Sequence, residues 1–215
     1  MNNSVRSTAR LLAAGLRALL VLTVVCGVVY PLVVTGIAQA AFHDKANGSE
    51  VKAGGKSAGS ERLGQTYTLD TKDRDGNPLP DPTYFQPRAS AAGASTENTR
   101  YHLVVSGASN LAADSKVLLD DVEQRRADVA EFNGVSPSTV PVDALTASAS
   151  GLDPDISPAY ARLQADRVAK ANHLPAATVR KLVEDHTDGR VLGFMGEERV
   201  NVLKLNIALR ELAKG

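Results

Sequence analysis

Residues 18–42 read ALLVLTVVCGVVYPLVVTGIAQAAF, and this stretch decides the architecture of the chain. None of its 25 residues carries a charge, and Leu, Val and Ala dominate it. As a helix it would be about 37 Å long at about 1.5 Å per residue, enough to cross a hydrocarbon core of about 30 Å with some tilt. We therefore predict a transmembrane helix over residues 18–42.

The charges on either side of this helix indicate its orientation. Arg6, Arg10 and Arg17 precede it, and the first acidic residue, Asp44, follows it. Because basic flanks stay in the cytoplasm, residues 1–17 are predicted to form a cytoplasmic N-terminus. The rest of the chain is then an extracytoplasmic domain on a single-pass anchor in the inner or plasma membrane.

A cleaved signal peptide is the alternative to a retained anchor. Ala38-Gln39-Ala40 has the small-x-small form that signal peptidase accepts. However, signal-peptide cores are about 7 to 15 residues long, and this apolar core is longer even if it ends at Ile37. A lipid-modified N-terminus is excluded because Cys26 lies in the middle of the span, after two bulky valines. The sequence favours a retained anchor.

One side of the predicted helix carries small or polar residues at every fourth position. Small and hydroxyl side chains let a second helix approach closely in lipid, where no hydrophobic effect drives association. We interpret this strip as the interface with a partner helix, although a solitary anchor also tolerates Gly and Pro. The strip consists of Thr23, Gly27, Pro31, Thr35 and Gln39.

The composition limits what the rest of the chain can do. With 215 residues there is room for one medium domain beside the anchor. After the three arginines the chain holds 21 basic and 24 acidic residues, without a basic run suited to nucleic acid. It has no Trp and only 4% aromatic residues, which argues against stacking on bases or sugars. The single cysteine allows no internal disulfide.

The remaining residues predict one α+β domain, residues 61–215, after a linker or loose hairpin at residues 43–60. Runs of strands before runs of helices are typical of this class. Asp114 and Ser157 stand at predicted helix starts, and Gly134 at a predicted helix end. Short strands are expected at residues 66–69, 83–85 and 101–105. Helices are expected between Asp114 and Gly134, at residues 158–171, over a short stretch after Pro175, and at residues 200–212.

Motifs for catalysis or metal binding are not convincing in this sequence. Gly55-Lys56-Ser57 resembles the end of a phosphate loop but lacks the preceding glycine and strand. The four histidines show no metal-ligand spacing. Asp153 and Asp155 precede a helix, where carboxylates stabilise the positive helix end. We therefore predict no catalytic residue, metal site or directly bound cofactor, and interpret the domain as an accessory or binding domain.

Six segments in register give the chain a resemblance to a known family. They lie at residues 29–36, 46–49, 59–65, 84–90, 150–158 and 196–206, and read VYPLVVTG, ANGS, GSERLGQ, YFQPRAS, SGLDPDISP and GEERVNVLKLN. Together they resemble the C subunit (KdpC family) of the bacterial Kdp potassium-transporting ATPase. The resemblance covers nearly the whole chain.

The resemblance implies a non-catalytic accessory subunit of a complex that imports potassium at the expense of ATP. Its partners would be a channel-like A subunit, a P-type ATPase B subunit and a small single-helix F subunit, and no nucleic acid. ATP with magnesium, and K⁺, would act in the complex. The family is described as a catalytic chaperone that raises the ATP affinity of the B subunit.

The resemblance also marks residues for docking or a link to nucleotide, Gln65 among them. A domain outside the membrane cannot meet cytoplasmic ATP, so we expect any effect on ATP affinity to pass through the membrane helices. The alternative from another class is a free-standing anchored or secreted envelope protein that binds a solute. The marked residues are Gly64, Gln65, Asp153, Pro154, Ser157 and Asn201.

Overall fold

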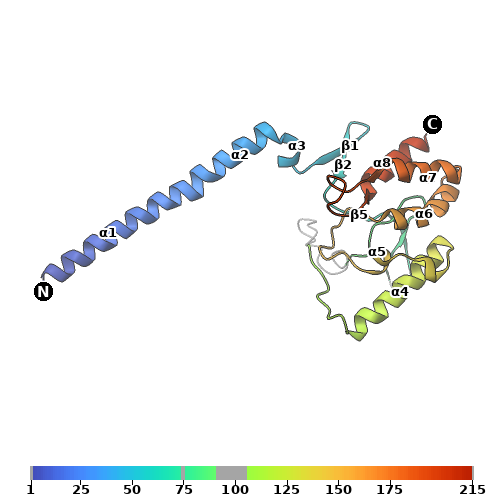
Figure 1. Ribbon diagram of the computed structural model, residues 1–215, viewed down its shortest axis with the longest axis horizontal. Helices are drawn as coiled ribbons and strands as arrows, with labels where there is room; N and C mark the ends of the chain where they lie inside the picture. The colour runs from blue at the N-terminus through green and yellow to red at the C-terminus, as the bar shows by residue number, and fades with distance from the viewer. Residues whose placement is uncertain (1, 74–75, 91–105, 215) are drawn as a thin grey trace. The chain divides into compact units, whose positions relative to one another are not determined.

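The computed structural model describes residues 2–73, 76–90 and 106–214, and the chain divides into two compact units (Figure 1). The N-terminal unit is residues 1–50 and the C-terminal unit residues 51–215. The α+β class is confirmed: a long apolar helix comes first, strands follow, and helices dominate the C-terminal half.

The N-terminal unit is a long helix followed by a single short turn of helix. Helix α1 (Asn2–Val24) continues through a π-helical turn, η1 (Val25–Val29), into α2 (Tyr30–Ala41), and α3 (His43–Ala46) follows. Val5–Ala41 is long and apolar enough to cross a membrane. The predicted apolar helix is therefore present, and it begins earlier than residue 18.

The π-helical turn has a local cause. Pro31 has no backbone N–H, and its ring conflicts with the carbonyl four residues earlier, on Gly27. A π turn relieves such a conflict by admitting one extra residue. Accordingly, the backbone N–H of Tyr30 donates to the carbonyl of Val25, five residues back.

The C-terminal unit opens with two small two-stranded sheets. Strand β1 (Glu50–Ala53) pairs with β2 (Lys56–Ser60) across Gly54 and Gly55, whose positive φ angles of 58° and 80° suit a type I′ turn. The loose hairpin expected there is thus a defined one. Strand β3 (Thr68–Lys72) pairs antiparallel with β4 (Pro78–Pro80). The strand predicted at residues 66–69 therefore begins two residues later.

The strand predicted at residues 83–85 is wrong. This segment is not part of a sheet because buried side-chain amides occupy its backbone groups. Asn206 accepts from the N–H of Phe85 and donates to its carbonyl, both at 2.9 Å. Gln164 pairs in the same way with the backbone of the following residue, Gln86, at 2.7 and 3.1 Å. The strand expected at residues 101–105 lies outside the described residues.

The first helices of the C-terminal half follow the predicted capping pattern with small shifts. Helix α4 (Lys116–Asn133) starts after Ser115, not at Asp114, and ends as predicted at Gly134, in the left-handed conformation with φ 66°. The Ser157 hydroxyl caps α6 (Pro158–Ala171) by accepting from the Tyr160 N–H at 3.0 Å, as predicted. Between them lie η2 (Pro137–Thr139) and α5 (Val142–Leu145), and α7 (Ala176–Asp185) follows α6.

A three-stranded antiparallel sheet, which the sequence pattern did not predict, lies among these helices. Its order is β5 (Asp155–Ile156), β7 (Arg199–Asn201) and β6 (Thr187–Asp188). The last helix, α8 (Val202–Leu212), consequently starts two residues later than predicted, because Val200 pairs with Ile156 and Thr187 in the central strand. The largest fully buried apolar side chains of the core are Phe85, Val168, Val179, Val183, Val200, Leu205 and Leu209.

Candidate functional site

The segment at residues 59–65, Gly-Ser-Glu-Arg-Leu-Gly-Gln, folds back so that its last residue contacts strand β2. The side-chain amide of Gln65 donates to the carbonyl of Ala58 at 2.9 Å. A Cβ atom on Gly59 would lie 1.9 Å from that amide nitrogen, and one on Gly64 would lie 2.5 Å from the carbonyl oxygen of Asp153. Close packing against backbone therefore requires the glycine at position 64, whereas Gly59 is favoured by its positive φ of 143°, and Gln65 bonds to the backbone of β2.

Two further motif segments meet the first one. The N–H of Gly64 donates to the carbonyl of Leu152 at 2.9 Å, and the N–H of Val202 donates to the carbonyl of Pro154 at 3.0 Å. Asn201 caps α8 and donates to the carbonyl of Glu61 at 2.8 Å. Segments 59–65, 150–158 and 196–206 are thus interlocked, although they are far apart in sequence.

Charged groups complete this junction. Asp153 accepts from Arg88 at 3.0 Å, and Asp155 accepts from Asn201 at 3.1 Å. Burial raises the pKa of Asp155 above its usual value, while the Asn201 hydrogen bond and the charge of Arg199 pull it down. Ser157 bonds to the Asp143 carboxylate through both its N–H and its hydroxyl, at 2.8 Å each. These contacts hold segments of the domain to one another.

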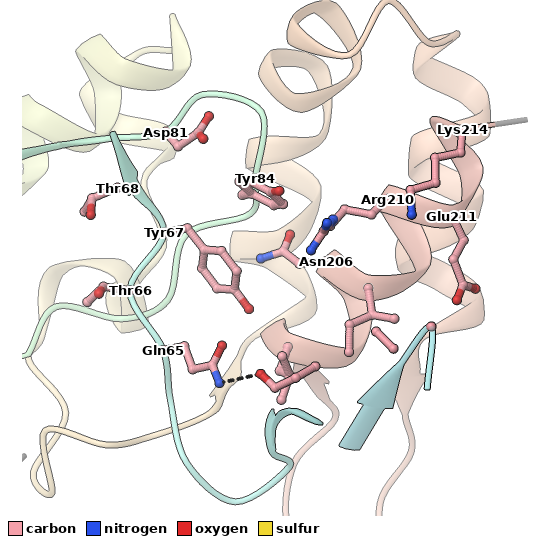
Figure 2. A pocket seen from close by; sticks show the side chains of 15 residues that line it. Gln65, Thr66, Tyr67, Thr68, Asp81, Tyr84, Asn206, Arg210, Glu211 and Lys214 are labelled. Atoms are coloured by element: carbon pink, nitrogen blue, oxygen red, sulfur yellow. Dashed lines mark hydrogen bonds between the residues drawn. The ribbon is translucent and has the colours of Figure 1, made fainter. Parts of the chain in front are cut away.

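Beside this junction the C-terminal unit has a cleft of about 490 Å³ (Figure 2). Gln65 and the residues leading into β3 form one wall, and α8 forms the opposite wall. The lining residues are Ala53, Gly54, Ala58, Gln65, Thr66, Tyr67, Thr68, Asp81, Tyr84, Leu203, Asn206, Ile207, Arg210, Glu211 and Lys214.

Two tyrosines give the cleft an aromatic side. The rings of Tyr67 and Tyr84 lie 5.2 Å apart between centroids. The Tyr67 hydroxyl is buried and makes no hydrogen bond within the described residues. Burial raises the pKa of Tyr67, while the neighbouring Asn206 amide and the charge of Arg210 lower it. A buried hydroxyl without a partner costs about 1 to 3 kcal/mol, so this position would gain from a water or a ligand atom.

The charges of the cleft are balanced. Arg210 and Lys214 are basic, and Asp81 and Glu211 are acidic. Asp81 is already engaged, because it accepts from the N–H and the hydroxyl of Thr83 at 2.9 and 2.6 Å. In the described ranges, no group of three or more His, Cys, Asp or Glu side chains is placed to hold a metal ion. The cleft can bind a polar molecule of low net charge.

The strip on the N-terminal helix is brought onto one face by the π turn. In an uninterrupted α-helix, residues four apart drift by about 40°, so Thr23 and Gln39 would lie about 160° apart. One extra residue in a π turn sets the following residues back by about 100°. With η1 between its ends, the strip of Thr23, Gly27, Pro31, Thr35 and Gln39 then falls within about 80° of the helix circumference.

Comparisons with known proteins identify the family. The family model described as "K+-transporting ATPase, c chain" matches residues 12–211. A relative named Potassium-transporting ATPase KdpC subunit, from Streptomyces avermitilis, is 57% identical over 99% of this chain and 98% of its own. Relatives of the same name are 44% identical in Mycobacterium tuberculosis (94% of this chain, 99% of theirs) and 43% in Ralstonia nicotianae (94% and 91%). This chain belongs to the KdpC family.

KdpC membership, together with the helix at Val5–Ala41, indicates an accessory subunit of a potassium-transporting ATPase with a membrane location. It also gives a structural meaning to the family motif residues. Gly64, Asp153, Pro154 and Asn201 meet at one junction, whereas Gln65 faces the cleft and Ser157 caps α6.

Sequence reasoning missed the aromatic and basic residues of the cleft. Tyr67 and Tyr84 fell in predicted strands and gave no separate signal. Arg210 lies on the predicted last helix, where a charged residue reads as an ordinary exposed side chain. Only the Gln65 motif pointed to this region, and it did so through the family resemblance.

Proposed function

We propose that this chain is the non-catalytic C subunit of an ATP-driven potassium importer, built to assemble with other membrane subunits. Its partners are a channel-like A subunit, a P-type ATPase B subunit and a small F subunit. Residues 1–17 lie in the cytoplasm and the C-terminal unit lies outside. The observation that carries the proposal is the strip of Thr23, Gly27, Pro31, Thr35 and Gln39, which the π turn aligns and which remains exposed along the helix.

Co-purification tests the assembly role. Gly27→Leu should reduce recovery of the other subunits, because added bulk separates helices without lowering hydrophobicity. No atom of the described residues outside the local helix lies within 4 Å of a Cβ placed on Gly27, so a loss would come from contact with another subunit. Val28→Leu, on the next residue, is the matched control. Equal recovery of both variants would remove the strip as the interface.

Thiol labelling tests the topology. Cysteines placed singly at Ser57 and Ser4, with Cys26→Ser, should react with a membrane-impermeant reagent on intact cells only at position 57. Labelling only at position 4 would reverse the orientation. A mature N-terminus after Ala40 would show that the helix is cleaved as a signal peptide.

We propose further that any effect on ATP affinity is indirect. The Gln65 amide is engaged with Ala58, and the balanced charges of the cleft suit a low net charge better than a polyphosphate. ATP with magnesium, and K⁺, are then handled by the other subunits. Calorimetry of the full chain in detergent should show no saturable ATP binding. Saturable binding that Gln65→Ala removes would overturn the indirect mechanism.

The alternative is a free-standing envelope protein that binds a solute. The cleft of about 490 Å³ is the observation that favours it, because its size and mixed lining suit a small molecule. Purification of the native chain from membranes that contain all subunits separates the two functions. An accessory subunit co-purifies with the ATPase, and a free-standing binding protein is recovered alone.

A further inference from the structure

The connection between β6 and β7 carries an exposed apolar tip, which we define as residues 191–195. Val191 and Met195 face each other in an antiparallel bridge, with backbone hydrogen bonds of 2.9 and 3.0 Å. The exposed fractions are 55% for Val191, 79% for Leu192, 71% for Phe194 and 52% for Met195. Single exposed apolar residues are ordinary, but four large ones on one short loop mark an interaction site.

The backbone conformation at the end of the apolar tip is unfavourable for leucine, the residue found there. Leu192 and Gly193 both have positive φ, 54° and 81°, as a type I′ turn requires. Such turns prefer Asn, Asp or Gly at the first position, and a leucine with positive φ is strained. Leu192 is also the most exposed of the four side chains, so packing within the described residues does not offset this strain. A strained and exposed leucine is expected where the side chain serves a contact outside the chain.

Strands β6 and β7 flank the apolar tip and connect it to the core of the domain. Strands β6 and β7 pair antiparallel, and Val200 in β7 is fully buried between neighbours on both sides of the sheet. The Thr187 hydroxyl donates to the carbonyl of Val183 in α7 at 2.8 Å, which ties the other end of the loop to a helix. The Val191–Met195 bridge and these anchored strands restrict the tip before binding, which favours affinity.

The charges around the apolar tip select the kind of partner. Residues 184–199 contain five acidic residues and two arginines. Arg199 is paired with Asp155 at 3.3 Å and lies 3.9 Å from Asp188, and Lys181 pairs with Asp185 at 3.0 Å. Next to the tip this leaves Glu197 and Glu198, with Arg190 and Arg162 in the hollow beside the loop. Segments that lie on membranes instead surround their apolar residues with Lys and Arg, which attract anionic lipids. An acidic surround disfavours a lipid surface.

We propose that the apolar tip inserts into an apolar pocket with a basic rim on another protein subunit of the potassium-transporting ATPase. This inference rests on the proposed accessory function and names the surface through which the C-terminal unit docks. Leu192 and Phe194 fill the pocket, and Glu197 and Glu198, next to the tip, face its basic rim.

Labelling of a single cysteine in permeabilised membranes tests this contact without depending on topology. Leu192→Cys in a Cys26→Ser background is produced either alone or with all other subunits, and reaction with a bulky maleimide is followed in time. Reaction should slow by about tenfold or more only when the other subunits are present, because a covered thiol reacts only while the interface is open. Val142→Cys, at a site with a similar exposed fraction of 73%, should react equally in both cases.

Each other outcome overturns the proposal in a different way. Equal labelling in both membranes means that the tip stays exposed in the complex. Protection in both membranes means that lipid or a second copy covers it. Recovery of the other subunits with the native chain is measured in the same membranes. If they are not recovered, the accessory function itself fails; if they are recovered and the tip still reacts, only this inference fails.

Discussion

The two units of this chain use their polar residues in opposite ways. In the C-terminal unit, buried amides and carboxylates bond inward and fix loops to helices; Asn206 and Gln164, at 2% and 0% exposure, are examples. In the N-terminal helix, the small and polar residues of the strip remain on the surface. Changes to the strip on the N-terminal helix should therefore reduce assembly, and changes to the buried polar residues of the C-terminal unit should reduce stability.

Replacement of Asn206 should give the largest loss of stability. Asn206→Leu removes both partners of the Phe85 backbone, which is fully buried, and should lower the free energy of unfolding by roughly 2 to 5 kcal/mol. Denaturant unfolding of the full chain in detergent measures this. Gln124→Leu makes the same kind of change on an exposed face of α4 and should stay within about 0.5 kcal/mol. Equal losses of stability in the two variants would show that the Asn206 amide has no special structural role.

A methyl group at Gly64 should have the next largest effect. In Gly64→Ala the added carbon would lie 2.5 Å from the Asp153 carbonyl, so the junction must move, at a cost of about 1 to 3 kcal/mol. Gly189→Ala is the control, because its added carbon meets open space at a φ that is not left-handed. Thermal unfolding of both variants gives the comparison. A tolerated Gly64→Ala would show that the family motif is retained for a reason other than packing.

Leu192 belongs to the C-terminal unit, but its replacement should reduce assembly and not stability. Leu192→Asn puts a residue favoured at positive φ at the end of the apolar tip, so stability should rise, by up to about 1 kcal/mol. Recovery of the other subunits should fall, as for a residue of the membrane strip. Leu119→Asn, on exposed α4, should leave this recovery unchanged. A simple loss of stability with full recovery would place Leu192 among ordinary structural residues.

The parts of the fold that could be predicted are those that depend on local chemistry. Residues 18–42, the Ser157 cap and the Gly134 helix end follow from hydrophobicity, capping and the left-handed conformation of glycine. The segment at residues 83–85 was mistaken for a strand because its backbone partners are distant along the chain: Asn206 bonds to Phe85 and Asn172 bonds to Thr83, more than 75 residues away in each case. Strands β5–β7 are only two or three residues long and leave no periodic signal.

The same limit applies to the candidate site. The membrane strip was visible because its spacing is local, but its alignment depends on a π turn that only the structure shows. Residues of the cleft come from three distant parts of the chain, so Tyr67 and Arg210 gave no joint signal. The separation is physical: contacts within a helix are encoded by spacing, whereas contacts across a domain are encoded by packing.

The smallest expected effect concerns pH and belongs to the C-terminal unit, where Asp155 lies. Burial raises the pKa of Asp155 above its usual 3.8. An acid with a raised pKa in the folded state favours folding most below its usual pKa, and this contribution is lost as the pH rises through the folded value. Asp155→Asn should therefore gain stability relative to the native chain as the pH rises above 3.8. The gain should be only a few tenths of a kcal/mol, because solvent screens the charge of a half-buried carboxylate.

Arg199→Gln should make the stability of the chain depend more steeply on pH than in the native chain, because the charge of Arg199 lowers the pKa of Asp155. Denaturant unfolding of the three chains across acidic to neutral pH measures both slopes. Parallel curves for the native chain and Asp155→Asn would mean that the carboxyl titrates alike in the folded and unfolded states, and that the junction tolerates its charge without cost.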